Sequence, residues 1–391
     1  MTVLRGRLVL ADRVVDDGVV VLEGDRIAAA GPLGEVPVPA DGPPGDLPDD
    51  VLLLPGLVDI HCHGGGGEEF GPDETSARRA AEHHHRAGTT TVVASLVSAP
   101  REALLAGMRV CAGLAAEGLV AGVHVEGPFL SHARRGAQDP DALVGVDLGL
   151  VDELADAGRG RWSVMTFAPE LDGADELIRR LAEHRVVPAV GHTDASAGQT
   201  AKALSAAMAA TGRPGLVTHL FNGMPPLHHR APGPAAACLA AAAWGEAVVE
   251  LVADGVHLAD ETVSMVMDVA APGSVVLVTD AMAACGMPEG RYTLGRLDVV
   301  VAGGTARLAD GSSIAGGVAT LLDVVRRCVR HAGTSLVETV AAASRVPATV
   351  LGLDGEVGAL APGLRADVLA VDEALRPVAV WRRGRRLEPG P

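Results

Sequence analysis

Between residues 57 and 282 the chain alternates eight short apolar runs with alanine-rich segments of helical period. Strands that alternate with helices are expected to pair in parallel, with the helices packed on the sheet. Eight such units are the number found in a closed (β/α)₈ barrel, the TIM-type fold. The runs are LVDIHCH (57–63), TTTVVASLV (89–97), LVAGVHVE (119–126), WSVMTFAPE (162–170), VVPAVGH (186–192), LVTHLFN (216–222), AVVELVAD (247–254) and VVLVTDAM (275–282).

The two ends of the chain lack this rhythm. Residues 1–54 and the tail at 366–387 contain short alternating strands, separated in the first case by D-D-G and E-G-D turns. Because isolated hairpins are marginal in water, we expect the two ends to pair into one small β-sandwich domain. The predicted domains are this discontinuous sandwich, residues 1–54 and 356–391, and the barrel, residues 55–355.

Three further predictions concern segments of the barrel region. Residues 291–318 are typical of a β-hairpin inserted after the eighth strand, and helices are predicted at 320–332 and 336–349. His83, His84 and His85 are consecutive in a predicted helix, where they point in different directions. We therefore interpret these three histidines as surface residues and not as a metal site.

Composition limits the class of partner. The formal net charge is −17 and the chain has three Trp, one Tyr and four Phe, so it lacks both the basic patches and the aromatic platforms that nucleic acids require. We expect no nucleic-acid partner and no membrane partner. The five cysteines have no CxxC spacing and the first residues carry too many charges for a signal peptide, which favours a reduced, cytoplasmic protein.

Possible metal ligands stand at or near the carboxyl ends of the predicted strands. In a barrel these ends share one face, where active sites lie. Each residue taken alone is more often a structural group than a ligand, but a set of this size at five strand ends is hard to explain in that way. The residues are His61, His63, Glu126, His192, His219 and Asp280.

The mixture of imidazole and carboxylate ligands favours Zn²⁺, and also suits Fe²⁺, Mn²⁺ or Co²⁺. An ion held by Glu126, His192 and His219 keeps one position open for water. Such an ion lowers the pKa of its water from 15.7 to roughly 7. Asp280 could then take the proton of this water and pass it to the leaving amine. Side chains two residues apart in a strand point to the same side. His61 and His63 are therefore placed to chelate one ion together.

Six motifs occur in order along the predicted barrel. They are PGLVDIHCHG (55–64), HVEGPFL (124–130), GHTDA (191–195), THLFNGM (218–224), DGVH (254–257) and VTDAM (278–282). Read together, they resemble the N-acetylglucosamine-6-phosphate deacetylases of the amidohydrolase superfamily. The resemblance implies a barrel with a small β-sandwich, a homodimer, and hydrolysis of the 2-acetamido group of N-acetyl-D-glucosamine 6-phosphate in amino-sugar catabolism and recycling.

The resemblance also implies roles for residues. Glu126, His192 and His219 correspond to metal ligands, Asp280 to the catalytic acid and base, and Arg230 to an arginine that reaches the neighbouring subunit's site. The implied substrate contacts are Ala137, Gln138, Asn222, Gly223, Arg230, Asp254, His257, Ile314, Ala315 and Gly316. The sequence departs from the family at Gln138, where a histidine is usual, at Gly223, where alanine is usual, and at Gly316–Gly317, where a Gly-Ser pair is common.

The sequence leaves two alternatives open. His61, His63 and Glu126 could hold a second ion with Asp280 close by, so that one or two ions bind per chain, or the two histidines could donate hydrogen bonds to substrate. The substrate could instead be N-acetylgalactosamine 6-phosphate or an N-acyl amino acid. A non-catalytic scaffold is disfavoured, because every expected ligand and Asp280 are present.

Overall fold

The eight apolar runs form a single parallel sheet in the computed structural model, and neighbours in the sheet follow one another along the chain. Nearly every residue in these strands is buried, as expected where helices cover a parallel sheet. The strands are β5 (Val58–Cys62), β8 (Thr91–Leu96), β9 (Gly122–Glu126), β10 (Trp162–Phe167), β11 (Val187–Val190), β12 (Gly215–Val217), β13 (Ala247–Leu251) and β14 (Val275–Leu277).

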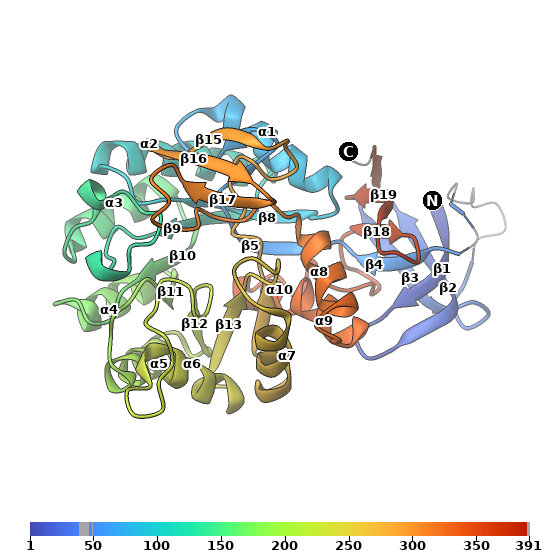
Figure 1. Cartoon of the computed structure of the whole chain (residues 1–391). Helices are drawn as coiled ribbons and strands as arrows, with labels where there is room; N and C mark the ends of the chain where they lie inside the picture. The colour runs from blue at the N-terminus through green and yellow to red at the C-terminus, as the bar shows by residue number, and fades with distance from the viewer. Residues whose placement is uncertain (39–46, 49, 389–391) are drawn as a thin grey trace. The chain divides into compact units, whose positions relative to one another are not determined.

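The end of the sheet returns to its beginning. Cys62 and Ala281 form a parallel bridge just beyond β14, and the backbone N–H of Asp280 donates to the carbonyl of His61 at 2.9 Å. The predicted (β/α)₈ barrel is therefore confirmed, and Figure 1 shows helices alternating with its strands. The helices between the strands are α1 (Glu74–Arg86), α2 (Arg101–Ala116), α3 (Leu148–Gly158), α4 (Ala174–Glu183), α5 (Ala197–Thr211), α6 (Gly233–Ala243) and α7 (Asp260–Val269).

Local sequence explains where these helices begin and which side they bury. On α4, Leu177, Ile178 and Leu181 are almost fully buried and form one apolar stripe. Burial of each such side chain contributes roughly 1.5–3 kcal/mol. Helix α5 begins with a capping box, in which Ser196 accepts the backbone N–H of Gln199 and the Gln199 side chain accepts that of Ser196.

The histidines of α1 contradict the surface prediction. His84 and His85 are buried, with 0% and 3% of their surface exposed. They continue a stripe begun by Ala77, Ala80 and Ala81, at the three- and four-residue spacing of a helix face. The helical period therefore carries two of the three histidines inward.

A small antiparallel sheet follows β14. Its strands are β15 (Gly290–Leu294), β16 (Leu297–Ala302) and β17 (Thr305–Leu308). The predicted hairpin thus has a third strand, because Gly303 and Gly304, with φ of +58° and +71°, turn the chain back after β16. Leu294 and Val299 pack with Met282 in a small buried cluster that joins this sheet to the segment after β14.

The two ends of the chain form one small β-domain, as predicted. Seven strands are hydrogen-bonded in the order β20-β19-β18-β4-β1-β2-β3, so C-terminal β18 pairs with N-terminal β4. Leu4, Leu53, Val368 and Trp381 lie in its buried core. The strands are β1 (Thr2–Val9), β2 (Val14–Glu23), β3 (Arg26–Pro32), β4 (Leu52–Pro55), β18 (Val368–Val371), β19 (Pro377–Arg382) and β20 (Arg385–Leu387).

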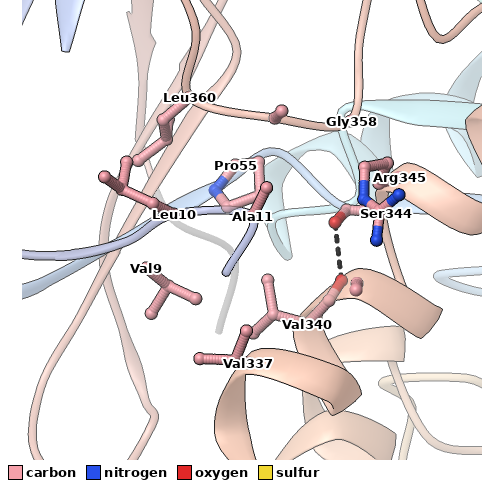
Figure 2. A pocket seen from close by; sticks show the side chains of 12 residues that line it. Val9, Leu10, Ala11, Pro55, Val337, Val340, Ser344, Arg345, Gly358 and Leu360 are labelled. Carbon is pink, nitrogen blue, oxygen red and sulfur yellow. Dashed lines mark hydrogen bonds between the residues drawn. The ribbon is translucent and has the colours of Figure 1, made fainter. Parts of the chain in front are cut away.

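The helical segment after residue 320 differs from its prediction at one point. The structure has α8 (Leu321–Arg330), α9 (Leu336–Ala342) and α10 (Arg345–Leu351), so the helix predicted at 336–349 is broken. Pro347 lacks the N–H that a continuous helix would need there. Ser344, at the break, donates instead to the carbonyl of Val340 at 2.5 Å, beside a small apolar pocket that Val9 and Leu10 also line (Figure 2).

The structure describes residues 1–38, 47–48 and 50–388. They divide into two compact units, one of Met1–Asp59, Glu82–Val92 and Thr320–Pro391 and one of Ile60–Ala81 and Val93–Ala319. The domain boundaries given above remain predictions. Among the helices of the described residues, none is both long and apolar enough to cross a membrane.

Candidate metal centre and active site

Three of the predicted site residues follow strand ends in a left-handed backbone conformation. His192 and His219 come two residues after β11 and β12, and Asp280 comes three residues after β14. Their φ angles are +47°, +26° and +47°. Residues other than glycine rarely adopt such angles, and those that do gather at functional sites.

The first group of facing side chains is Glu126, His192 and His219, which we call the Glu126 triad. The Glu126 Oε1 atom lies 3.0 Å from the Nε2 atom of each histidine, and the two Nε2 atoms lie 3.0 Å apart. His192 donates its Nδ1–H to the carbonyl of Arg134 at 2.8 Å. Its Nε2 atom therefore presents a lone pair to the other two ligand atoms.

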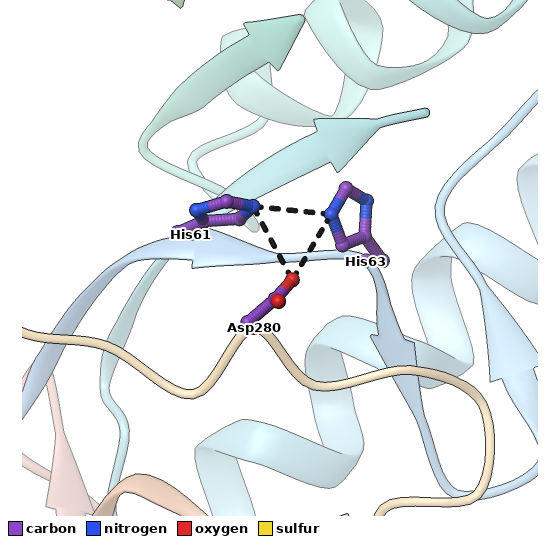
Figure 3. Close-up of side chains that lie close together, drawn as sticks. All are labelled: His61, His63 and Asp280. Carbon is purple, nitrogen blue, oxygen red and sulfur yellow. Dashed lines mark hydrogen bonds and ion pairs between the residues drawn. The ribbon is translucent and has the colours of Figure 1, made fainter. Parts of the chain in front are cut away.

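The second group is His61, His63 and Asp280, the His61 triad (Figure 3). The two Nε2 atoms lie 3.1 Å apart, and each lies 3.3 Å from Asp280 Oδ1. Both Nδ1 atoms point away: that of His61 donates to Glu250 Oε2 at 3.0 Å and that of His63 to the Ser95 carbonyl at 3.1 Å. This pattern again leaves the Nε2 lone pairs facing inward.

Glu126 belongs to both groups. Its Oε1 atom meets the two histidines of its own triad, while its Oε2 atom lies 3.1 Å from His63 Nε2. Oε2 also accepts a hydrogen bond of 2.5 Å from Nε2 of Gln138, whose Oε1 accepts the backbone N–H of Ser98 at 2.8 Å. Gln138 therefore holds the Glu126 carboxylate in place by a hydrogen bond.

The charges of the cluster fit a cation. Burial disfavours a charged imidazole, yet Asp280 and Glu126 outweigh it and raise the pKa of His61 to about 9 and that of His63 to about 10. Burial likewise disfavours ionised Asp280, but His61 and His63 outweigh it and lower the pKa of Asp280. Positive charge therefore stabilises the two carboxylates, and a divalent ion bound among the inward-facing lone pairs would provide that charge. The residues present fit a metal.

A buried polar layer supports the cluster from inside the barrel. The ring of His124 packs edge-on against His61, with 4.6 Å between ring centroids. Its nitrogens are hydrogen-bonded to Ser95 Oγ at 3.0 Å and Thr166 Oγ1 at 2.8 Å. Burial holds the pKa of His124 well below its ordinary value, so this ring is a neutral support and not a third site for charge.

A pocket of about 190 Å³ opens above the two triads. Its lining includes ligands from both triads, Leu294 of the inserted sheet, and several predicted substrate contacts. The predicted contacts that line it are Ala137, Gln138, Asn222, Gly223, His257, Ile314 and Gly316. A cavity with few convergent polar groups beside perturbed titratable residues has the character of an active site.

Three predicted substrate contacts are not in this lining. Asp254 instead positions His257, accepting its Nδ1–H at 2.8 Å. Ala315 is fully buried in the cluster beneath the inserted sheet. Arg230 is exposed on the loop after β12 and hydrogen-bonds to its neighbour His229 at 2.7 Å.

A model of the amidohydrolase family matches residues 52–387. This chain belongs to the amidohydrolase family. Together with the two triads, the match makes the protein a metal-dependent amidohydrolase.

Related proteins of known function narrow the position of the chain within this family. N-acetylgalactosamine-6-phosphate deacetylase of Escherichia coli O157:H7 is 35% identical over 86% of this amidohydrolase and 88% of its own length. N-acetylglucosamine-6-phosphate deacetylase of Bacillus subtilis is 30% identical, with 86% and 85% covered. A mutant N-acetyl-D-glucosamine-6-phosphate deacetylase of Mycobacterium smegmatis, solved in complex with N-acetyl-D-glucosamine-6-phosphate, is 37% identical and superposes with a TM-score of 0.91 over 98% of both chains.

Two buried residues of this amidohydrolase site were missed in the sequence. Glu250 lies in the middle of the apolar run AVVEL, and His124 lies two residues before Glu126 in GVHVE. For Glu250 the available signal was a single charged residue inside an otherwise apolar strand, because a buried charge is usually retained with a partner. The sequence could not name that partner, since it lies on another strand.

Proposed function

We propose that this amidohydrolase hydrolyses the 2-acetamido group of N-acetyl-D-glucosamine 6-phosphate, giving D-glucosamine 6-phosphate and acetate in amino-sugar catabolism. The observation that carries the proposal is the pair of adjacent triads at the pocket, one of which contains Asp280, with Glu126 in contact with the histidines of both. Relatives that span most of the chain are deacetylases of phosphorylated amino sugars.

Glu126, His192 and His219 would hold the main ion, for which Zn²⁺ is our first choice and Fe²⁺, Mn²⁺ or Co²⁺ are alternatives, because all accept imidazole and carboxylate ligands. When bound, the ion lowers the pKa of a water molecule and polarises the amide carbonyl. His61 and His63, together with Glu126, would hold a second ion close to Asp280, so that one or two ions bind per chain.

Asp280 would move the proton. Its carboxylate lines the pocket, and its lowered pKa keeps it ionised and able to accept a proton from the attacking water. The water oxygen bonds to the acetyl carbon as the carbon–nitrogen bond breaks. Asp280 then returns the proton to the leaving nitrogen, and the remaining proton of the water passes to the amine, so that the products are acetate and the protonated amine of D-glucosamine 6-phosphate.

The sugar and its phosphate would meet the rim of the pocket. His257 donates its Nδ1–H to Asp254 and so leaves Nε2 for the substrate. Burial lowers the pKa of His257, but Asp254 outweighs it and raises that pKa, which favours an imidazolium near an anion. Gln138, Asn222, Gly223 and the loop 314–316 would complete the contacts.

A second copy of the chain would supply the arginine that binds the phosphate group of the substrate. No lysine or arginine is among the residues that line the described pocket, although a phosphate calls for cationic donors. Arg230 is exposed and forms no ion pair with a carboxylate of the described residues. We therefore include in the proposal a homodimer in which Arg230 reaches the partner's site.

Mixing two inactive variants tests the dimer. Arg230→Ala lacks the arginine and Asp280→Asn lacks the proton carrier, so each should be weakly active alone. If Arg230 acts across the interface, a hybrid dimer regains one complete site and activity rises on mixing. If the activity of the mixture equals the sum of the activities of the two separate variants, Arg230 does not act across the interface.

The galactosamine epimer is a second candidate substrate, favoured by the 35% identical relative that deacetylates N-acetylgalactosamine 6-phosphate. Acetate release should be measured on both phosphorylated epimers, on unphosphorylated N-acetylglucosamine and on an N-acyl amino acid. We expect the highest kcat/KM for N-acetylglucosamine 6-phosphate. Release from none of the four would overturn the deacetylase proposal.

We also propose a cytoplasmic location. All five cysteines are buried and lie outside disulfides, and burial raises the pKa of the Cys111 and Cys238 thiols to about 12. Buried cysteines that form no disulfide are typical of a reducing compartment. Fractionation of the native host would test this location.

A further inference from the structure

A carboxylate outside the predicted ligand set lies behind both triads. Glu250 is in β13, and only 1% of its surface is exposed. Its backbone carbonyl accepts the N–H of Leu220, which ties β13 to the segment that carries His219. Glu250 does not line the pocket described above, so its contacts are with the protein and not with a substrate.

One oxygen of this carboxylate serves one residue of each triad. Oε2 of Glu250 accepts the Nδ1–H of His61 at 3.0 Å and the backbone N–H of His219 at 3.1 Å. A carboxylate can only accept here, so the hydrogen bond fixes the proton of His61 on Nδ1. The Nε2 atom of His61 is then left to face Asp280 and Glu126.

The second contact falls on a residue with an unfavourable backbone. His219 has a φ of +26°, and its own Nδ1 atom has no hydrogen-bond partner among the described residues. The bond from its backbone N–H to Glu250 is therefore a main restraint on the orientation of its ring. A sparsely populated conformation persists only where surrounding groups hold it.

Burial of this carboxylate is costly and needs an explanation. No lysine or arginine of the described chain forms an ion pair with Glu250, whose charged neighbour is His61. A buried carboxylate without a permanent cation destabilises a fold, whereas an apolar residue would fill a strand position more favourably. Metal-binding histidines, by contrast, commonly donate their second N–H to such a group.

We infer that Glu250 is a positioning residue that couples the two halves of the metal centre, by fixing the tautomer of His61 and the backbone of His219. The inference rests on the proposed metal centre but not on the identity of the substrate. Loss of Glu250 should weaken the His61 site most, because the imidazole loses its acceptor. The Glu126 site should weaken less, since its three ligand atoms remain.

Metal binding tests the inference without reference to activity. Metal-free wild type, Glu250→Gln and His61→Ala are titrated with Co²⁺, and binding is followed by calorimetry and by visible absorption. Glutamine keeps the size of the side chain, and loss of a carboxylate that accepts the second N–H of a metal-binding histidine costs about 10–100-fold in metal affinity. We expect Glu250→Gln to bind the second equivalent of Co²⁺ about 10–100-fold more weakly than wild type and to retain the first equivalent.

A double-mutant cycle and a matched control complete the test. Because Glu250 acts through His61, the double variant should bind the second equivalent no more weakly than His61→Ala alone. Asp367→Asn serves as the control. It removes another buried carboxylate, which accepts the backbone N–H of Arg383 at 2.7 Å and belongs to the compact unit that contains both chain ends. This control should bind Co²⁺ as wild type does.

Three results would overturn the inference. They are unchanged affinity in Glu250→Gln, additive effects of Glu250→Gln and His61→Ala, and a wild type whose only bound equivalent is insensitive to both changes. In each case acetate release could still occur through the Glu126 triad, so the proposed function would survive. If Glu250→Gln fails to fold, Glu250→Asp takes its place and should lie between wild type and His61→Ala.

Discussion

The two halves of the metal centre are built in different ways. In the Glu126 triad the three ligand atoms lie 3.0 Å from one another, yet both histidines have left-handed backbones beyond strand ends. In the His61 triad the separations are 3.1–3.3 Å, and His61 lies within β5 with its Nδ1–H held by Glu250. Both histidines of the Glu126 triad are thus placed by a left-handed backbone, whereas in the His61 triad only Asp280 has one and both histidines are oriented through hydrogen bonds from Nδ1.

The shared carboxylate means that the halves are not independent. Glu126 faces its own histidines with Oε1 and His63 with Oε2. The comparison predicts that the Glu126 half carries the catalytic ion and that the His61 half tunes it. Variants should therefore fall into a fixed order of effect.

Replacement of Glu126 should have the largest effect. Glu126→Ala removes a ligand from both triads and leaves four facing histidines without their shared carboxylate. We expect both metal equivalents to be lost and acetate release to fall by roughly 10³-fold or more, since an ion contributes several kcal/mol to the transition state. Metal analysis and acetate assays check this, with the exposed Glu261→Gln of α7 as control. If Glu126→Ala retains one tightly bound metal equivalent, Glu126 is not a ligand that the two sites share.

A histidine of the Glu126 half should come next. His192→Ala removes one ligand of three, and we expect loss of the main equivalent with a fall in kcat of about 10²–10³-fold, as several kcal/mol of the ion's contribution disappear. Excess Zn²⁺ should restore part of the activity, because Glu126 and His219 remain. A variant that keeps full activity would show that the ion lies elsewhere.

The corresponding change in the His61 half should be milder. His63→Ala leaves the Glu126 triad complete, so we expect one equivalent to remain and kcat to fall by about tenfold, within the 10–100-fold range of changes near a metal ligand. Metal content after removal of excess ion, measured beside His192→Ala, gives the comparison. Equal losses in the two variants would mean that the halves play equal parts.

The smallest predicted effect concerns the loop that follows His63. Burial raises the pKa of Glu69 from 4.5 to about 7, although the N–H of Gly295 and the hydroxyl of Thr293 oppose the rise. Between these pH values the folded chain holds a proton that the unfolded chain releases, so stability decreases as pH rises.

Glu69→Gln removes this titration. At pH 8 it should be more stable than wild type by roughly 1–2 kcal/mol, and at pH 4 the two should be alike. Urea unfolding at both pH values measures the difference, with the neighbouring Glu68→Gln as control. A difference that is the same at pH 4 and pH 8 would exclude Glu69 as its source.

Much of this architecture follows from the sequence, for a physical reason. Strand and helix periods are local, so the alternation of runs such as LVDIHCH and LVTHLFN with helical segments predicts the barrel. Because parallel strands place their carboxyl ends at one face, residues as distant as His61 and Asp280 can be predicted to meet. The pairing of the chain ends follows from the instability of isolated hairpins.

The other features depend on contacts between residues that are distant in the sequence, and strand and helix periods do not reveal such contacts. The left-handed backbones of His192 and His219 are imposed by their surroundings, and the tautomer of His61 depends on Glu250 of another strand. The break near Pro347 and the buried His84 are different, because proline chemistry and the helical stripe were both visible in the sequence.

The most direct test of the account is a side-by-side measurement of metal content and acetate release for wild type and Asp280→Asn, with N-acetylglucosamine 6-phosphate as substrate. If Asp280 carries the proton, the variant keeps the ion of the Glu126 triad and loses about 10²–10⁴-fold in kcat, the contribution of one positioned acid and base. Activity that falls only in proportion to lost metal would contradict it, because Asp280 would then be a ligand and not the carrier of the proton.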